Sequence, residues 1–416
     1  MMTNTQVKIP CHLQTIIEEI FTQHHIESKT LTVRLPLKPG DNWMGTVYEI
    51  EASDLNNQSK IASLSLIAKL APTVQLYRDF FPVRSSYERE IYTYNEILPE
   101  FFNLQKENNI KNTFAPFPKC FKTLSKDTEE VIVLENMLKR EYKSLNNRHS
   151  ANYQVASLIM TNLGKLHALS FALRNQKPEL FKKIGVNTED SFFHSHFGDI
   201  YLKIVHNLGQ EVLNSLKKDT RAYETFAKFI EDPSFVIDVL LTSKCAGKYA
   251  VICHGDPQIR NMLFKYENKV ESDTPKKVCF LDWQLCKLGN PCLDIAFFIW
   301  TCTDKKLRDC HYDGLLEIYY SSLSTFLRSF GECPETCYPR DVFKDNLKQF
   351  SVYGLFASLW VILTNVVDTK NFPNVHSAKT SECLIDMLST VSDSTYLDRM
   401  RDIINDFVDY GYNMHG

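Results

Sequence analysis

The chain lacks the glycine pattern of P-loop nucleotide sites. No G-x-x-x-x-G-K-[ST] run occurs in its 416 residues, which argues against a site of that kind. An excess of charge of one sign is also missing, because 47 basic and 50 acidic residues give a formal net charge of −3. Near neutrality gives no electrostatic reason to expect a nucleic acid or an anionic membrane as a partner. The composition, 44% hydrophobic and 23% charged, is that of a globular protein with room for two lobes.

Cysteines at zinc-site spacing are also missing. Among twelve cysteines, the one close pair of note is Cys333 and Cys337, whose three-residue gap is not that of a zinc knuckle and has no second half. Most of the others lie in apolar segments, so we expect reduced thiols that act as small apolar side chains. Residues 1–8 are polar and lack the apolar core of a signal peptide. These features predict a cytoplasmic protein, and they indicate no obligate protein partner.

One long stretch, residues 350–367, carries no charged side chain. Its length approaches the ~20 residues that span a bilayer. Polar and small residues dilute it, however, and no strongly basic flank marks a cytoplasmic side. We therefore expect a helix buried in the larger part of the protein, and no membrane partner.

Two short polar motifs carry the strongest chemical signal. Residues 254–261 read HGDPQIRN after the apolar segment 249–253, and the run FLDW follows at 280–283. The first motif resembles the protein-kinase pattern H-R-D-x-x-x-x-N. Gly255 stands where that pattern has Arg, which points away from ordinary protein kinases and toward small-molecule kinases of the same fold.

The spacing of these motifs assigns a role to each polar side chain. In kinases the Asp of the loop accepts the proton of the attacking hydroxyl, the Asn holds a metal, and a later Asp completes the magnesium site. Asp256 is therefore the expected base, and Asn261 and Asp282 are the expected Mg²⁺ ligands. The alternative for any one of these aspartates is a turn cap. The set of three, in this order and between apolar strands, favours phosphoryl transfer.

The predicted elements before residue 137 follow the order of a kinase small lobe. Alternating apolar and polar side chains between turn signals predict strands, and helical spacing predicts two helices, the second ended by Pro99. Residues 135–137 form the expected hinge. The expected elements are a helix over 12–23, strands over 31–37, 46–52 and 64–70, a helix over 87–98, and strands over 119–124 and 130–134.

Beyond the hinge, helical periodicity dominates the chain. We expect an α+β, bilobal protein-kinase-like fold. Residues 1–136 would form a small β-rich N-terminal lobe that clamps the nucleotide phosphates. Residues 137–416 would form a large, mainly helical C-terminal lobe with the catalytic loop, the metal site and the acceptor pocket. Expected helices cover 155–173, 295–302, 315–330, 350–367 and 397–410, with two more inside 199–229, and residues 268–277 suit a hairpin tip.

Lys69 lies inside an apolar strand, where a lysine needs a partner or an edge position. We expect it to bind the phosphates of ATP, held by a salt bridge from the following helix. Glu90 fits this role better than Glu88, because its helical neighbours form an apolar face that turns inward. The alternative is a lysine that extends to solvent from an edge strand.

Two further segments are expected to contact the nucleotide. The hairpin tip that begins Gly40-Asp41-Asn42 would cover the phosphates, although it lacks the G-x-G-x-x-G pattern and is a weak signal alone. Glu135 and Met137, at the hinge, would contact the adenine.

Three other polar residues suit a supporting role. His167 lies on a predicted helix and is expected to be a buried, hydrogen-bonded core residue. His254 is expected to brace its loop rather than transfer protons. Asp294 could tie the catalytic loop by hydrogen bonds.

Taken in order, these segments resemble the ecdysteroid kinase-like family of arthropods, a relative of choline and aminoglycoside kinases. Gln284 is the best discriminator, because choline and aminoglycoside kinases usually carry an acidic residue there. The matching residues are Gly40 to Trp43, Lys69, Tyr87 with Glu90 and Tyr94, Leu98-Pro99, Val133 to Met137, Leu166 to Ser170, residues 254–261 and 281–284, and Gly289 with Pro291 and Asp294.

The resemblance implies a bilobal kinase-like fold and ATP-dependent phosphorylation of a small-molecule hydroxyl. In characterised relatives the acceptor is an ecdysteroid, phosphorylated at its side-chain 22-hydroxyl, and other members are suspected to act on plant or xenobiotic compounds. The sequence departs from the family pattern at Asn136 and Trp283, and at Pro257 and Gln258, where bulky apolar residues are usual. The last two lie beside the expected base and could alter acceptor preference.

Two alternatives stay open at this point. A choline- or aminoglycoside-type kinase would take a cationic acceptor, and its pocket should converge acidic or aromatic groups on the amine. An inactive pseudokinase would bind a hormone or a partner instead. The presence of all five key polar groups argues against the second alternative.

Overall fold

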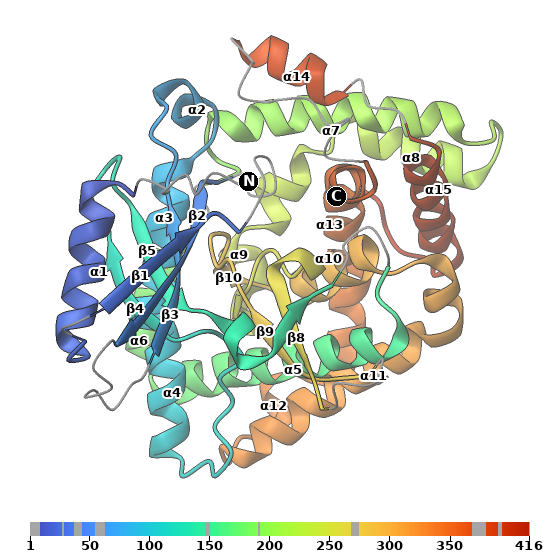
Figure 1. The fold of residues 1–416 in the computed structure, drawn as a ribbon. Coiled ribbons are helices and arrows are strands. Elements are labelled where there is room, and N and C mark those ends of the chain that lie inside the picture. The colour runs from blue at the N-terminus through green and yellow to red at the C-terminus, as the bar shows by residue number, and fades with distance from the viewer. Residues whose placement is uncertain are drawn as a thin grey trace.

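A five-stranded antiparallel sheet forms the smaller part of the protein (Figure 1). The structure is a computed structural model that describes residues 9–26, 29–36, 44–54, 63–145, 150–189, 192–267, 274–367, 380–389 and 393–415. The strand order is β1-β2-β3-β5-β4. The strands are β1 (Lys29–Arg34), β2 (Thr46–Asp54), β3 (Ser63–Leu70), β4 (Cys120–Leu124) and β5 (Val131–Glu135).

Each face of this sheet packs on a helix. Alternate residues of the strands, such as Leu66 and Val133, share a core with Ile16 and other residues of α1 (Cys11–Gln23). On the opposite face, Ile132 joins the larger core together with the apolar side of α3 (Val83–Tyr92). The period of two that predicted the strands therefore also separates these two faces.

The helix expected to end at Pro99 continues past it, so that part of the prediction is wrong. A π-helical turn, Thr93–Ile97, joins α3 to α4 (Leu98–Glu107). Pro99 lies in the first turn of α4, where proline breaks no hydrogen bond of the new helix. A short helix that the sequence did not indicate, α2 (Gln75–Phe80), precedes α3.

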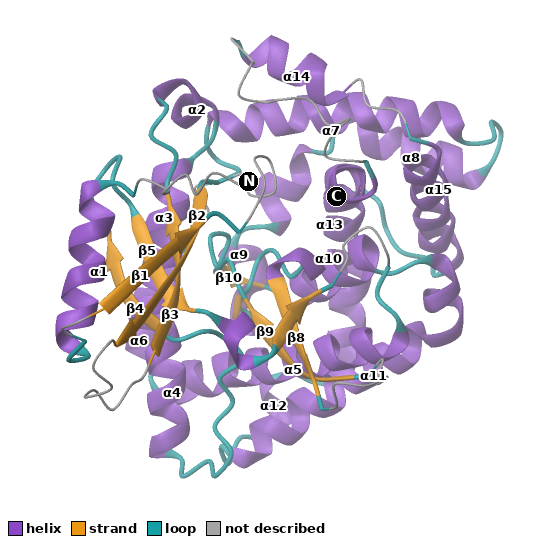
Figure 2. Cartoon of the chain, in the orientation of Figure 1, coloured by secondary structure: helices purple, strands orange, loops and turns teal. Residues whose placement is uncertain are grey.

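Helices make up most of the larger part and surround two small sheets (Figure 2). The small sheets are β7 (Val251–Cys253) with β10 (Lys287–Gly289), and β6 (Tyr142–Ser144) with β8 (Met262–Tyr266) and β9 (Pro275–Phe280). The helices are α5 (Tyr153–Gln176), α6 (Pro178–Asn187), α7 (His196–Ser215), α8 (Arg221–Glu231), α9 (Ser243–Ala246), α10 (Cys292–Cys302), α11 (Lys305–Ser329), α12 (Pro334–Cys337), α13 (Arg340–Val366), α14 (Ser381–Ser389) and α15 (Ser394–Asp409).

The long apolar stretch forms the second half of α13, which packs against α10. Within the described residues, the helical stretch Pro334–Val366 is the one that is long and apolar enough to cross a membrane, and 78% of its apolar window is buried. Gly354 allows the close approach, because a Cβ there would lie 2.4 Å from the carbonyl oxygen of Ala296 on α10. The prediction of a helix buried in the larger part is confirmed.

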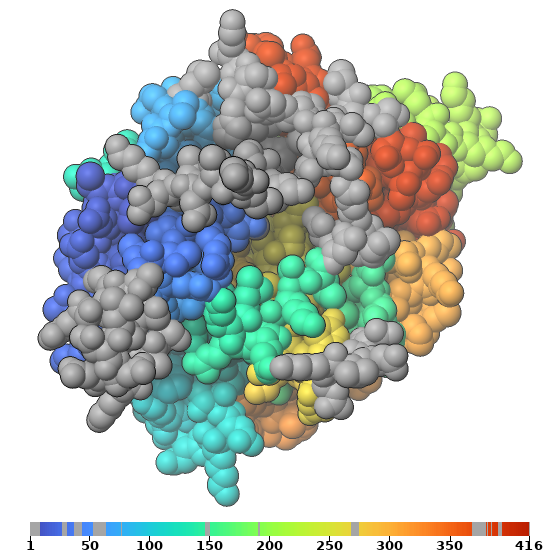
Figure 3. Space-filling view, viewed as in Figure 1, coloured from blue at the N-terminus to red at the C-terminus, as the bar shows by residue number. Residues whose placement is uncertain are grey.

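The predicted architecture is confirmed as an α+β fold of the protein-kinase type. The sheet and α3 form a small β-rich part, and the elements after β5 form a larger, mainly helical part. A 3₁₀ turn, Met137–Arg140, follows β5 at the expected hinge. In the space-filling view the green residues around β6 adjoin the yellow β8–β9 hairpin (Figure 3), with which β6 pairs. The boundary between residues 136 and 137 stays a prediction.

Candidate active site

Lys69 links the five-stranded sheet to Glu90 on α3 and to Asp282, which follows β9. It pairs in register with Ile132, so its side chain leaves the sheet on the face that α3 covers. Its Nζ lies 2.7 Å from Oε2 of Glu90 and 2.7 Å from Oδ1 of Asp282. Glu88, the competing partner, instead forms an exposed pair with Arg84 at 2.6 Å. The structure thus brings three of the predicted site residues into one cluster.

The electrostatics of this cluster favour an additional cation. Burial alone would lower the pKa of Lys69, but the charges of Asp282 and Glu90 raise it, so the ammonium stays charged. Burial raises the pKa of Glu90 to about 7, although the charge of Lys69 lowers it. Two carboxyl groups share one ammonium here, and the side chain of Asp282 is 22% exposed. A cation that binds Asp282 would therefore be stabilised.

The catalytic loop begins where β7 ends and turns sharply at Gly255. This glycine has a φ of +87°, and a Cβ there would lie 2.0 Å from the carbonyl oxygen of Leu285. An arginine, as in the protein-kinase pattern, would not fit this backbone. The sharp turn places Asp256, which is 6% exposed, inside the protein behind the loop.

Two amide side chains hold the carboxylate of Asp256. Nε2 of Gln258 donates to its two oxygens at 2.8 and 2.9 Å, and Nδ2 of Asn261 donates to Oδ2 at 2.8 Å. Burial raises the pKa of Asp256 to about 6, against the hydrogen bond of Gln258, which lowers it. Because Asn261 turns its NH₂ group toward Asp256, its Oδ1 points away from that carboxylate. An oxygen of the type that Mg²⁺ prefers is therefore presented beside the carboxylate of Asp256.

Hydrogen bonds join the segment that carries Asp282 to the catalytic loop. The backbone N–H of Leu281 donates to the carbonyl of Asn261 at 2.9 Å, and a ring nitrogen of His254 lies 3.0 Å from the carbonyl oxygen of Leu281. Asp282 itself has a φ of +63°, a strained backbone for a residue with a side chain. These bonds at the base of the β8–β9 hairpin bring Asn261 and Asp282 together, as the spacing predicted.

Asp294 fixes the start of the catalytic loop from inside the core. Its carboxylate accepts the backbone N–H groups of His254 at 2.7 Å and Gly255 at 2.9 Å. It also lies 3.2 Å from Nε2 of His167, whose Nδ1 is 2.8 Å from the hydroxyl of Tyr319. Burial alone would raise the pKa of Asp294, but the hydrogen bond and charge of His167 lower it. Both histidines and Asp294 therefore have the structural positions expected of them.

His167, Asp294 and Cys253 also lie within 4.8 Å of one another by their potential ligand atoms, as metal ligands do. Both oxygens of Asp294 already accept backbone hydrogen bonds, however. This cluster is better described as a brace than as a metal site.

Of the two hinge residues predicted to contact the nucleotide, Glu135 has a side chain that is already engaged within the protein. The carboxylate of Glu135 pairs with Arg140 at 2.5 Å, and Met137 begins the 3₁₀ turn. Asn136, which was not among the predicted site residues, donates to Glu49 at 3.0 Å and to Ser65 at 3.0 Å. Its side chain ties the hinge to β2 and β3, so the backbone at 135–137 is held in place.

Gly40, Asp41 and Asn42 lie outside the described residues. The described chain resumes at Met44, whose carbonyl accepts a hydrogen bond from the hydroxyl of Tyr87 at 2.8 Å. Gly45 has a φ of +143°, and a Cβ there would lie 2.0 Å from the carbonyl oxygen of Leu70. The start of β2 is thereby fixed close to the end of β3, where Lys69 lies.

An aromatic wall formed by α7 and α13 lies near Asp256. We use this name for Tyr201, Phe356 and Trp360, whose rings pack at 5.4 Å (Tyr201 to Phe356) and 6.4 Å (Tyr201 to Trp360). Tyr201 is close enough to Asp256 for its charge to act on the phenol, whose pKa is raised by burial and by that charge. These three aromatic residues could not be predicted from the sequence, because aromatic residues in helices are usually part of the core.

Arg260 ties the catalytic loop to the end of α13. Its guanidinium donates to the carbonyl of Thr364 at 3.2 Å and to Oδ1 of Asn365 at 2.5 Å. Near the middle of the same helix, the hydroxyl of Tyr353 donates to the carbonyl of Gly255 at 3.4 Å. Helix α13 therefore lies alongside the loop that carries Asp256.

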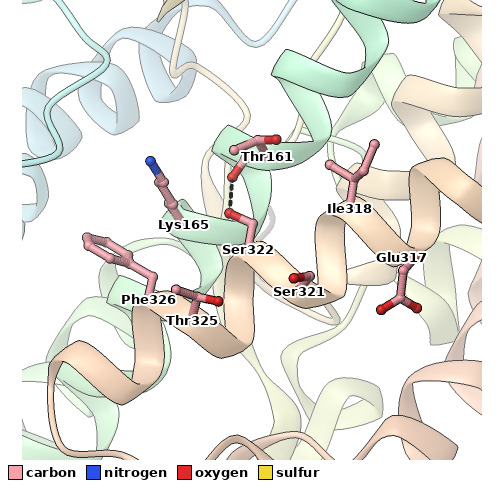
Figure 4. Close-up of a pocket in the computed structure, with 8 residues that line it drawn as sticks. All are labelled: Thr161, Lys165, Glu317, Ile318, Ser321, Ser322, Thr325 and Phe326. Carbon is pink, nitrogen blue, oxygen red and sulfur yellow. Dashed lines mark hydrogen bonds between the residues drawn. The ribbon is translucent and has the colours of Figure 1, made fainter.

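A pocket of about 460 Å³ lies elsewhere, between α5 and α11 (Figure 4). The hydroxyl of Ser322 closes one side by donating to the carbonyl of Thr161 at 2.7 Å. None of the predicted site residues lines it, so it is separate from the chemistry. Its lining residues are Thr161, Lys165, Glu317, Ile318, Ser321, Ser322, Thr325 and Phe326.

The fold and the site together define a phosphotransferase of the protein-kinase-like class. The model of the ecdysteroid kinase-like family matches residues 39–332, more than half of the chain, and the chain belongs to that family. The predicted resemblance is therefore confirmed, and the match supports a small-molecule kinase. No curated protein matches the chain.

Among solved structures, the chain is similar to the GDP complex of wild-type aminoglycoside 2'-phosphotransferase-IIIa. The identity is 12% and the TM-score 0.41, over 96% of this chain and 100% of that one. The GDP complex of a point mutant of the same enzyme gives 12% identity and a TM-score of 0.42, over 96% and 97% of the two chains.

Proposed function

We propose that this protein transfers the terminal phosphoryl group of ATP to a hydroxyl group of an ecdysteroid, or of a similar steroid or xenobiotic alcohol, in the cytoplasm. The observation that carries the proposal is the position of Lys69, whose Nζ bridges Glu90 and Asp282 at 2.7 Å each. This geometry supports a lysine that binds the phosphates next to Asp282, the proposed metal ligand. Membership of the ecdysteroid kinase-like family supports the acceptor class.

The residues present fit Mg²⁺. Asp282 bonds Lys69 through Oδ1, and no described residue donates to its Oδ2. The amide of Asn261 offers Oδ1, since its NH₂ is bonded to Asp256. A carboxylate and an amide oxygen, with phosphate oxygens and water, make up the oxygen set that Mg²⁺ takes, and the ion would neutralise charge on the phosphates.

Asp256 is the proposed base. The acceptor hydroxyl donates its hydrogen bond to the carboxylate, which Gln258 and Asn261 hold in one orientation. As the acceptor oxygen bonds to the γ-phosphorus, the bond from that phosphorus to the bridging oxygen of ADP breaks. The hydroxyl proton passes to Asp256. Lys69 binds the phosphates, Glu90 orients Lys69, and the backbone near Glu135 and Met137 binds the adenine.

Within the aromatic wall, the partly exposed ring of Trp360 supports an acceptor with an apolar surface. Tyr201 and Phe356 are almost fully buried, and Trp360 is partly exposed. Aromatic faces also bind quaternary amines. A choline- or aminoglycoside-type activity is therefore the competing outcome of the test.

The test is a panel of acceptors incubated with purified protein and γ-labelled ATP. We expect label transfer to an ecdysteroid or another steroid alcohol, and loss of transfer when EDTA removes Mg²⁺. Transfer to choline or kanamycin but to no steroid would replace the proposed acceptor class. Binding of Mg·ATP without transfer to any alcohol would favour the inactive hormone-binding alternative.

The pH dependence of transfer is expected to report the raised pKa of Asp256. Burial raises this pKa to about 6, so the base begins to gain a proton well above the ordinary value of about 3.9 for Asp. Only the ionised carboxylate accepts a proton. The kcat/KM for the acceptor should therefore be level above about pH 7 and fall about tenfold per unit below about pH 6. A profile that stays flat down to about pH 5, at constant nucleotide affinity, would contradict the assignment.

A further inference from the structure

Gln258 lies directly against the carboxylate of the proposed base. Its Nε2 donates to both oxygens of Asp256, while Nδ2 of Asn261 donates to Oδ2 alone. Oδ2 therefore has two donors and Oδ1 has one. Because each carboxylate oxygen accepts about two hydrogen bonds, Oδ1 keeps the capacity to accept the acceptor hydroxyl. That hydroxyl would then lie next to the amide of Gln258.

The other end of this amide is unusual. Oε1 of Gln258 is buried and has no hydrogen-bond donor within the described residues, and the residue is only 9% exposed. Rotation of the amide by half a turn would not help, since it would direct Oε1 at the carboxylate of Asp256 and repel it. Buried amide oxygens in native proteins almost always have a donor, so this one calls for a donor that the part of the chain described by the structure does not supply.

We propose that Gln258 determines which alcohols are phosphorylated. Its Nε2 holds Asp256, and its Oε1 accepts a hydrogen bond from a second hydroxyl of the acceptor, on a carbon next to the one that carries the reacting hydroxyl. The inference rests on the proposed function and narrows the acceptor to vicinal diols. Gln258 itself exchanges no proton.

This arrangement discriminates against two other kinds of acceptor. An alcohol with one hydroxyl leaves Oε1 buried without a donor, and sites built to bond a polar group reject analogues that lack it. A quaternary amino alcohol such as choline has no N–H to offer in place of the second hydroxyl. A glutamine in place of the usual bulky apolar residue at position 258 would thus make the enzyme select diols.

The test uses ecdysone and 20-hydroxyecdysone, which differ by one hydroxyl on the carbon next to that of the side-chain 22-hydroxyl. Affinities of both are measured by calorimetry in the presence of Mg²⁺ and a non-hydrolysable ATP analogue, and kcat/KM is measured with ATP. Wild-type protein should prefer the diol by about 10-fold or more in both measurements. Gln258→Met should bring the ratio close to one.

Gln349→Met is the matched control, because Gln349 lies exposed on α13 with its Nε2 3.8 Å from Sγ of Cys245. It should keep the wild-type ratio. A ratio near one in the wild-type protein, an unchanged ratio in folded Gln258→Met, or no binding of either steroid would overturn the inference. Selective binding of the diol without transfer to either steroid would uphold the role of Gln258 in recognition and overturn the proposed phosphoryl transfer instead.

Discussion

Asp256→Asn is expected to lower kcat for the acceptor by about 10³-fold, because the substitution removes the group that takes the hydroxyl proton. The new amide would also place an NH₂ group against the donors of Gln258 and Asn261, which now hold a carboxylate. Nucleotide affinity should hardly change, since Lys69 bonds Glu90 and Asp282 and not Asp256. Single-turnover transfer with labelled ATP measures the first effect, and calorimetry with Mg²⁺ and an ATP analogue measures the second.

Asp313→Asn serves as the control for this substitution. Asp313 is exposed on α11 and far in sequence from the catalytic loop, so its variant should retain wild-type turnover. If Asp256→Asn retained turnover as well, the assignment of the base would be wrong. A loss of nucleotide binding together with turnover would instead indicate a role in the metal site.

The parts of the site that the sequence predicted are those fixed by local rules. Alternation along β3 sets the face from which Lys69 leaves the sheet, and helical periodicity turns Glu90 rather than Glu88 inward. The five-residue spacing from Asp256 to Asn261 is a single turn of loop, short enough to bring both side chains into one hydrogen-bonded unit. In each case the sequence distance between the groups, or their period, decides the geometry.

The parts that the sequence did not predict depend on contacts between distant segments. Tyr201 and Phe356 are 155 positions apart, and nothing in either helix marks it as a neighbour of the base. The error at Pro99 has a local origin instead, because a π-helical turn rather than a helix end precedes the proline. The sequence marks Gln258 as a departure from the family pattern that could alter acceptor preference, but it does not indicate how. The proposed role of Gln258 depends on the orientation of its side-chain amide, which the hydrogen bond to Asp256 sets.

The loss of Asp294 is expected to lower stability strongly. It is fully buried, and its carboxylate is the acceptor for two backbone N–H groups of the catalytic loop and the neighbour of His167. In Asp294→Asn, one carboxylate oxygen becomes an NH₂ group that faces a donor. Hydrogen bonds to a buried charged group contribute about 1.5–3 kcal/mol each, and an unpaired buried donor is penalised further. We expect the free energy of unfolding to fall by about 3 kcal/mol, measured by urea denaturation, and turnover to fall with it.

Two comparisons distinguish the loss of the hydrogen bonds of Asp294 from a nonspecific loss of packing. Tyr319→Phe removes only the hydroxyl that lies 2.8 Å from Nδ1 of His167, so it should cost about 1 kcal/mol. The second comparison is pH. Because the pKa of Asp294 is lowered in the folded protein, its ionised form stabilises the fold above the ordinary Asp value of about 3.9. That stabilisation is lost as the pH falls through the lowered pKa. The difference between wild type and Asp294→Asn should therefore narrow below about pH 4, and a difference that is constant down to the acid unfolding of both proteins would contradict the ionic brace.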